Sequence, residues 1–334
     1  MNGEINPELR KQLENQLGRE FEWRELEDGL NTVYHLSSPE NEYILKERTN
    51  PKNKVEWFRA EPQIYKAIKD NTNVPSPEVV YQDFSTEAYQ NIFYVMEKMP
   101  GSNPQNMEKE LTQSDLEEII LQYGKILGKL HKVKVSDKYG IQGFEDGNFT
   151  SSEPNDKWGE SIEGAMSSWQ DIIQEEWENP PNIEYNSDKV KEVLPEKPEP
   201  VLVHSDNRLD NILLTGTEIT GFIDWSTSWT GHKYYDIVRA KYLLIEWDLS
   251  FWDQEFEEEK LEQKLIEGYR QETGFEENEK YLKIEKVYRY AATLWLGAGF
   301  ANWGQNLGEE KHEEMRTEIT QRIKKEQKKL QDTT

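Results

Sequence analysis

One stretch of the chain, residues 201–225, constrains the fold and the function more than any other. An apolar triplet, V-L-V, enters the polar loop H-S-D-N-R-L-D-N, which returns directly to an apolar I-L-L. After a short turn, a further apolar run ends at Asp224. Short apolar runs bounded by polar turns predict buried β-strands. We therefore expect Asp206 and Asn211 of the loop to converge with Asp224 on one cleft.

These three side chains suit phosphoryl transfer. A carboxylate can accept the proton of an attacking hydroxyl group. An amide oxygen and a second carboxylate are hard ligands of the kind that Mg²⁺ prefers. Asp and Asn also make ordinary turns, so the loop has a purely structural interpretation. Its position between apolar runs, with a further acid after the next run, favours the catalytic one.

The order H-x-D-x-x-x-x-N followed by I-D-W resembles the phosphotransferase family that includes aminoglycoside phosphotransferases, choline kinase and related small-molecule kinases. The resemblance implies an α+β fold of two lobes, shared with protein kinases, with ATP bound between the lobes. The small N-lobe, residues 1–98, would hold an antiparallel sheet and one helix. The larger, mainly helical C-lobe, residues 99–334, would hold the catalytic loop and the substrate site.

The resemblance also implies a role for each residue of the loop. Asp206 would be the catalytic base, and Asn211 and Asp224 would be the ligands of Mg²⁺. His204 would steady the loop.

The loop departs from the family pattern at two places. Ser205 stands where Gly is usual, which narrows the freedom of the backbone. Asn207 and Arg208 stand where an apolar residue and often a His are found. Asp236, further along, matches a structural acid of the family that braces the loop through its backbone N–H groups. It is equally compatible with a favourable acid at a helix N-terminus.

The N-terminal part predicts strands on both sides of a turn at Gly29, with a third strand ending at Lys46. The resemblance implies that Gly29 and Asn31 belong to a loop whose backbone covers the ATP phosphates. Any hairpin would show the same pattern. The resemblance also implies that Lys46 grips the α- and β-phosphates and pairs with a helical glutamate. The alternative is a solvated lysine at a strand end.

The expected partner of Lys46 is Glu61, in a helical segment that covers residues 54–68. Pro62 follows it directly, and a proline inside a helix removes a hydrogen bond. We therefore expect the helix to kink or to restart at Pro62, and Glu56 is the alternative partner.

An apolar strand, residues 91–96, ends before Pro100-Gly101, a pair that marks a break. It resembles the hinge between the lobes of the family, where the main chain of Glu97 and Met99 would bind the adenine edge. A strand followed by an ordinary turn fits the same residues.

Helical periodicity begins after Thr112 and continues to His131, which we interpret as structural. The Gly- and Asp-rich segment 137–155 is expected to be a loop. Further helices are expected over residues 158–178, 253–271, 278–301 and 309–330.

The composition narrows the choice of partners. The formal net charge is −25, from 65 acidic and 40 basic residues, which argues against nucleic acid and anionic membrane as partners. The acidity fits either a salt-adapted surface or an acidic pocket for a cationic substrate. The chain has no cysteine, which excludes disulfides. No signal peptide and no run long enough to span a bilayer are visible, so we expect a soluble, cytoplasmic protein.

The sequence thus predicts transfer of the γ-phosphoryl group of ATP to a hydroxyl of a small molecule, with an aminoglycoside-like aminosugar as the best candidate. A protein kinase is the nearest alternative, but I-D-W replaces D-F-G and no A-P-E follows. A catalytically silent nucleotide-binding module of the same fold is another. Nine of the eleven tryptophans follow residue 150 and serve either core packing or a wall for a cationic substrate. The acids that could pair with substrate amines include Glu246, Asp248 and Asp253.

Overall fold

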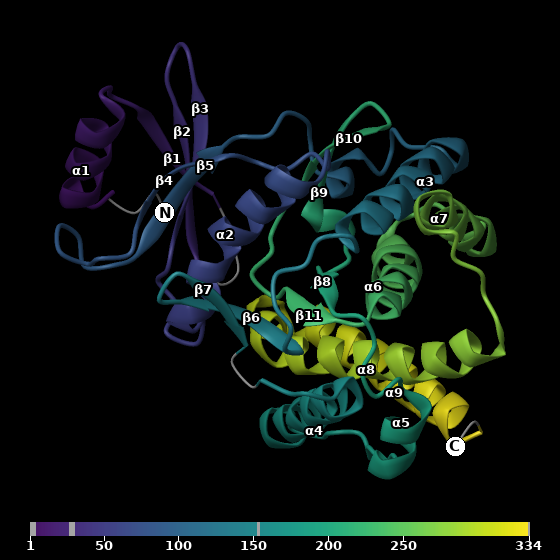
Figure 1. Ribbon diagram of the computed structural model, residues 1–334. Coiled ribbons are helices and arrows are strands. Elements are labelled where there is room, and N and C mark those ends of the chain that lie inside the picture. The colour runs from purple at the N-terminus through teal and green to yellow at the C-terminus, as the bar shows by residue number, and fades with distance from the viewer. Residues whose placement is uncertain (1–4, 27–30, 152–153, 333–334) are drawn as a thin grey trace.

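The computed structural model describes residues 5–26, 31–151 and 154–332. Its first lobe is built on an antiparallel sheet with the strand order β1-β2-β3-β5-β4 (Figure 1). The predicted turn at Gly29 lies outside the described residues. The strands are β1 (Glu22–Leu26), β2 (Thr32–Ser37), β3 (Glu42–Glu47), β4 (Val79–Asp83) and β5 (Phe93–Glu97).

Two helices cover the two faces of this sheet. The helix α1 (Pro7–Leu17) buries Leu9 and Leu13, which lie one helical turn apart, against the outer face. The helix α2 (Val55–Asn71) packs on the inner face and continues through Pro62. The predicted restart of the helix at Pro62 is therefore wrong. The proline costs one backbone hydrogen bond, and the apolar side chains buried on both sides of it, such as Phe58 and Ile64, outweigh that loss.

The second lobe is mainly helical. Its first long helix, α3 (Gln113–Leu130), begins at a capping box between Thr112 and Asp115. The predicted helix 253–271 begins later, as α7 (Glu258–Thr273), because residues 248–251 form a separate 3₁₀ turn. The other helices of this lobe are α4 (Trp158–Glu176), α5 (Ser187–Val193), α6 (Lys233–Arg239), a π-helix (Ala240–Trp247), α8 (Glu279–Trp303) and α9 (Glu309–Gln331).

Segment 137–155 is not the predicted loop, since it forms a hairpin of β6 (Gly140–Glu145) and β7 (Asn148–Ser151). The turn is Asp146-Gly147, and both residues have positive φ, 48° and 80°. An Asp-Gly pair with this geometry favours a tight hairpin, and the sequence interpretation missed it. The hairpin extends a sheet of order β7-β6-β11-β8 that includes β8 (Val201–Val203) and β11 (Trp229–Gly231).

The β6–β7 hairpin of the second lobe packs against the first lobe. It lies beneath α2 (Figure 1), and a Cβ added at Gly143 of β6 would come within 3.1 Å of Glu56 Cγ on α2. A second hairpin consists of β9 (Ile212–Thr215) and β10 (Glu218–Phe222). Its residue Leu214 forms a β-bridge with Ser102. The polar loop 204–211 runs between β8 and β9, so both of its ends are anchored in sheets.

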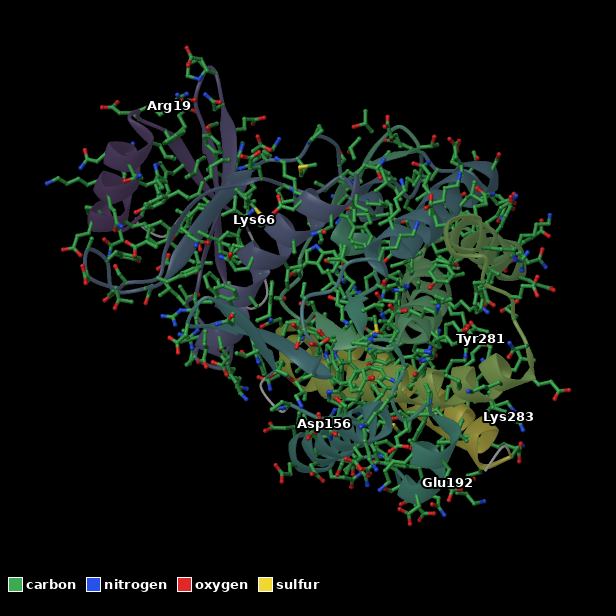
Figure 2. The ribbon with its side chains drawn as sticks, in the orientation of Figure 1. Arg19, Lys66, Asp156, Glu192, Tyr281 and Lys283 are labelled. Carbon is green, nitrogen blue, oxygen red and sulfur yellow. The ribbon has the colours of Figure 1, made fainter. Side chains whose placement is uncertain are left out.

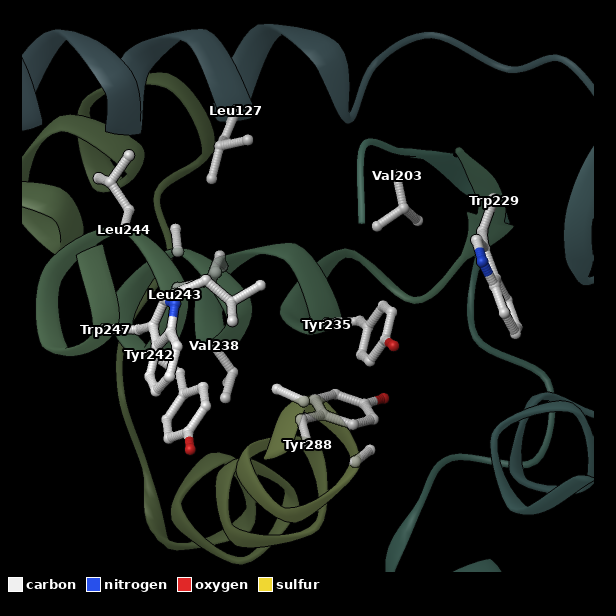
Figure 3. Packing of buried hydrophobic residues seen from close by; sticks show 14 of the residues in the cluster. Leu127, Val203, Trp229, Tyr235, Val238, Tyr242, Leu243, Leu244, Trp247 and Tyr288 are labelled. Carbon is white, nitrogen blue, oxygen red and sulfur yellow. The ribbon is translucent and has the colours of Figure 1, made fainter. Parts of the chain in front are cut away.

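Most of the tryptophans after residue 150 serve packing. Figure 3 shows Trp229 and Trp247 among the buried side chains of the C-lobe, where they are 5% and 3% exposed. The small antiparallel N-lobe and the larger helical C-lobe confirm the predicted fold class. Among the described residues, no helix is both long enough and apolar enough to cross a membrane.

Candidate active site

The first half of the polar loop is held by the side chain of Asp236, which lies on α6. This carboxylate accepts hydrogen bonds from His204 N and Ser205 N, both at 2.8 Å, and from Asn207 Nδ2 at 2.6 Å. Burial raises the pKa of Asp236, but hydrogen bonding to His131 and the loop outweighs burial and holds the pKa below its usual value. The loop therefore rests on a buried, ionised carboxylate.

Ser205 has a φ of +74°, in the left-handed region that favours glycine. Its carbonyl accepts a hydrogen bond from Arg239 Nε, and the Arg239 guanidinium stacks 4.2 Å from the centre of the Trp295 ring. Arg239 is fully buried. Sequence reasoning missed it, although it lies three residues after Asp236 and so on the same helical face.

His204 connects the loop to the strand end that carries Asp224. Its Nε2 hydrogen-bonds the Ile223 carbonyl at 3.0 Å, and its ring lies 4.5 Å from the Trp225 ring. The structure therefore places His204 where it can steady both segments.

Asp206 and Asn211 lie at the two ends of the same turn. Asn211 Nδ2 donates to the Asp206 carbonyl at 2.8 Å, which turns the amide nitrogen inward and leaves Oδ1 for another ligand. Asp206 Oδ1 is buried and has no hydrogen-bond partner within the part of the chain that the structure describes. A buried carboxylate oxygen without a donor is costly, and a substrate hydroxyl group would satisfy it.

Lys46, Glu61 and Asp224 come from three distant segments and form one ion cluster. Lys46 Nζ lies 3.0 Å from Glu61 Oε2 and 3.1 Å from Asp224 Oδ1. The lysine and the glutamate are both buried, at 6% and 1% exposure. Lys46 thus pairs with Glu61, whereas Glu56 lies against the β6–β7 hairpin.

The cluster keeps Asp224 ionised. Burial raises its pKa, but the Lys46 ammonium and hydrogen bonding by Ser226 outweigh burial and lower the pKa to about 2. Glu61 behaves oppositely, since burial raises its pKa even though Lys46 opposes the rise.

A second residue of α2, Tyr65, holds the backbone of Asp224. The Asp224 N–H donates to Tyr65 Oη at 3.0 Å, and the Trp225 N–H donates to Glu61 Oε1 at 3.2 Å. Glu61 and Tyr65 are four positions apart and so share a helical face. Asp224 has a φ of +59°, so these bonds fix a left-handed residue. The sequence interpretation did not identify Tyr65.

The predicted phosphate loop is only partly described. Gly29 lies outside the described residues. Asn31 is buried, and its Oδ1 accepts a hydrogen bond from Asn53 Nδ2 at 3.2 Å. The side chain of Asn31 therefore joins two N-lobe segments.

The predicted hinge follows β5. The Glu97 N–H donates to the Glu78 carbonyl at 2.9 Å, so of its two backbone groups only the carbonyl can face an adenine edge. Met99 is half-buried, and its Cβ approaches Gly221 of β10.

The second half of the loop is held by Asp248. Its carboxylate accepts from Leu209 N at 2.7 Å and from Arg208 Nε at 3.2 Å. Burial raises the pKa of Asp248 to about 7, although the Arg208 guanidinium opposes the rise. Glu246 is engaged in the same way, by Arg289 Nη2 at 2.5 Å. Internal cations and N–H groups therefore already engage Glu246 and Asp248.

The oxygen donors of Asn211 and Asp224 fit Mg²⁺. Among the described residues no group of three or more His, Cys, Asp or Glu side chains could enclose a metal. Mg²⁺ does not need one, because it usually binds one or two protein oxygens together with waters and substrate phosphates. Asn211 Oδ1 and the ionised carboxylate of Asp224 supply oxygens of that kind.

Comparison with known proteins gives a family and a set of similar folds. Residues 22–275 match the phosphotransferase enzyme family. A search of curated proteins found no match. The structure of aminoglycoside phosphotransferase APH(4)-Ia is 16% identical and has a TM-score of 0.62, with 96% of this chain and 98% of that chain covered.

Two further structures are similar. The streptomycin–ATP ternary complex of APH(2″)-IIa is 14% identical with a TM-score of 0.59, over 96% of this chain and 99% of that chain. The ADP-bound aminoglycoside phosphotransferase APH(2″)-Ib is 15% identical with a TM-score of 0.57, over 95% and 98%. At these identities the likeness concerns the fold.

Proposed function

The chain belongs to the phosphotransferase enzyme family, and we propose that it transfers the γ-phosphoryl group of ATP to a hydroxyl group of a small molecule. The observation that carries this proposal is the ion cluster of Lys46, Glu61 and Asp224, which come from three distant segments and are joined to the catalytic loop by the hydrogen bonds of Ile223. The buried pair of Lys46 and Glu61 has little value as a packing element, since desolvating two charges is costly. It has value as a preorganised site for phosphate oxygens.

Asp206 is the proposed base. Its Oδ1 is buried without a partner among the described residues, so it can accept the hydrogen bond and then the proton of the acceptor hydroxyl. The Asn211 amide fixes the backbone of Asp206 and therefore the direction of its carboxylate. Placing the hydroxyl in line with the γ-phosphorus is the main task of such a site.

Lys46 is the proposed ligand of the α- and β-phosphates. Glu61 orients the ammonium group, and the raised pKa of Glu61 reflects the burial of that pair. Asn211 and Asp224 would hold Mg²⁺, which when bound neutralises charge on the β- and γ-phosphates. The carbonyl of Glu97 and the main chain of Met99 would face the adenine ring. We place the boundary between nucleotide and substrate lobes at residues 98 and 99.

An aminoglycoside-like aminosugar is the proposed acceptor. Hygromycin B is bound in a ternary complex of APH(4)-Ia, and streptomycin in one of APH(2″)-IIa. The net charge of −25 favours the approach of a polycation. The family and the similar structures favour a small-molecule kinase over a protein kinase. The silent binding module is disfavoured because Asp206, Asn211 and Asp224 are all present.

A substrate screen tests the proposal. ATP consumption is measured with aminoglycosides, choline, homoserine, macrolides and simple sugars, with Asp206→Asn as the matched control. Turnover that depends on one acceptor class and is lost in Asp206→Asn supports the proposal. ATP binding without turnover for any acceptor would favour the silent module instead.

A further inference from the structure

Two buried carboxylates hold the catalytic loop, one on each side of Asp206. Asp236 accepts the N–H groups of the first half, whereas Asp248, only 1% exposed, accepts the Leu209 N–H at 2.7 Å. Leu209 begins the 3₁₀ turn Leu209–Asn211, and the first N–H groups of such a turn have no partner inside it. Asp248 therefore acts as an N-cap supplied from 39 residues away.

We propose that Asp248 is a positioning residue for phosphoryl transfer, which acts through Leu209 and Arg208 to orient Asn211 and Asp206. The inference rests on the proposed function, since it assumes that Asp206 is the base. Asn211 ends the turn that Asp248 caps, and its amide in turn holds the Asp206 carbonyl at 2.8 Å. A shift of the turn thus reaches both the proposed base and the proposed metal ligand.

Arg208 gives Asp248 a second task. This guanidinium lies two residues after Asp206 and is attracted by the carboxylates of Asp248, Asp206 and Asp210. Asp248 binds its Nε at 3.2 Å and Asp210 binds its Nη2 at 2.9 Å, so these two carboxylates engage the guanidinium in place of the base. Without Asp248, Arg208 would be free to pair with Asp206, and a paired carboxylate is a weaker proton acceptor.

The π-helix explains how one segment supplies both carboxylates. In a continuous α-helix, the twelve positions from Asp236 to Asp248 would span about 3.3 turns, so the two side chains would point about a third of a turn apart. Residues Ala240–Trp247 instead form a π-helix, which takes more residues per turn. The wider turn brings Asp248 back toward the face that Asp236 presents to the loop. Such π segments are rare and are frequently found at functional sites.

The test uses Asp248→Asn in the full chain, with Asp171→Asn as the matched control. Asp171 is exposed on α4, and its side chain has no part in the loop. We expect kcat of Asp248→Asn to fall by on the order of 10²-fold because the reacting groups are misplaced. KM for ATP should stay within about twofold, because Lys46 and the hinge are untouched.

Amide hydrogen exchange measures the hydrogen bond between Leu209 and Asp248 independently of catalytic activity. Exchange at Leu209 should accelerate at least about tenfold in Asp248→Asn and stay unchanged in Asp171→Asn. The double variant Arg208→Gln with Asp248→Asn also removes the cation that has lost Asp248 as its partner, so it should recover part of the lost kcat and keep the fold if the single variant does not.

Wild-type kcat in Asp248→Asn, or no recovery in the double variant, would make Asp248 a structural residue only and overturn the proposal. Unchanged exchange at Leu209 would overturn it as well. A wild-type chain without turnover would contradict the proposed function instead, and the exchange measurement would still decide whether Asp248 controls the loop.

Discussion

Ser205 holds a left-handed backbone conformation directly before the proposed base. At a φ of +74° its Cβ crowds the backbone, a strain of about 1–2 kcal/mol for a residue other than glycine. The bonds from its N–H to Asp236 and from Arg239 to its carbonyl hold the conformation. Strain of this kind is retained where the surroundings over-determine it, as at active sites.

Ser205→Gly should therefore stabilise the protein. Release of the strain exceeds the extra entropy that glycine gives the unfolded chain, which leaves a net gain of up to about 1 kcal/mol in the free energy of unfolding. Urea denaturation measures this gain in the free energy of unfolding. Ser205→Ala keeps the Cβ and should show no gain, and an equal gain in both variants would mean that the hydroxyl, not the backbone, is responsible.

Tyr65 controls Asp224 through a single hydroxyl group. Tyr65→Phe leaves the Asp224 N–H without its 3.0 Å partner, so the unfolding free energy should fall by about 1–3 kcal/mol. Asp224 should also become less well fixed, and the Mg²⁺ concentration for half-maximal activity should rise. Denaturation and a Mg²⁺ titration give the two values.

Tyr281→Phe is the control for Tyr65→Phe. Tyr281 is equally buried, and its hydroxyl has no hydrogen-bond partner among the described residues. Loss of the Tyr281 hydroxyl group should alter neither the free energy of unfolding nor the Mg²⁺ concentration for half-maximal activity. A Tyr65→Phe variant with an unchanged Mg²⁺ requirement would show that Tyr65 supports the fold but not the metal ligand.

The helix α3 packs closely against α7 and also contacts the catalytic loop. A Cβ on Gly268 of α7 would lie 2.0 Å from the Leu121 carbonyl oxygen of α3, so the two backbones are in contact. On the same helix α3, Tyr123 Oη donates to Asn207 Oδ1 in the loop at 2.8 Å. The position of α3 therefore affects the loop directly.

Gly268→Ala should force the two helices apart and destabilise the protein by about 1–3 kcal/mol, as overpacking does. Gly164→Ala is the matched control, because Gly164 is an exposed helical glycine of α4 with open space around it. There alanine should add up to about 1 kcal/mol through helix propensity. Thermal unfolding of both variants gives the comparison, and equal effects would contradict the close contact.

Across the molecule, local patterns predicted some features and not others. The helical periodicity after Thr112 is a local signal, and the structure confirms it as α3. Asp146-Gly147 was an equally local signal for the hairpin, but the glycine-rich composition around it was interpreted as a loop.

The long-range contacts could not be predicted from the sequence. Nothing near Tyr65 shows that it meets Asp224, 159 positions away, and nothing near Asp248 shows that it caps the turn at Leu209. These partners depend on how α2 and the π-helix approach the loop, which is decided by tertiary packing. The resemblance to a family supplied Asp206, Asn211 and Asp224 because their spacing is fixed in one short stretch.

The acidic surface belongs to the whole molecule as well. Carboxylates such as those of Asp156 and Glu192 lie around the outline of the protein (Figure 2). Their spread fits a salt-adapted surface, and the negative field that they create together also attracts cations from solution.

The central claim is that Asp206 acts on the hydroxyl proton while Asn211 and Asp224 act on Mg²⁺. A Mg²⁺ titration of kcat for Asp206→Asn, Asn211→Ala and Asp224→Asn tests it most directly. All three should lose rate. Asp206→Asn should keep the wild-type Mg²⁺ requirement, because the amide keeps its size and loses only the proton acceptor. Asp224→Asn should need more Mg²⁺, and Asn211→Ala should shift the same way by a smaller amount. Full rescue of Asp206→Asn by high Mg²⁺, with no shift in Asp224→Asn, would contradict the assignment.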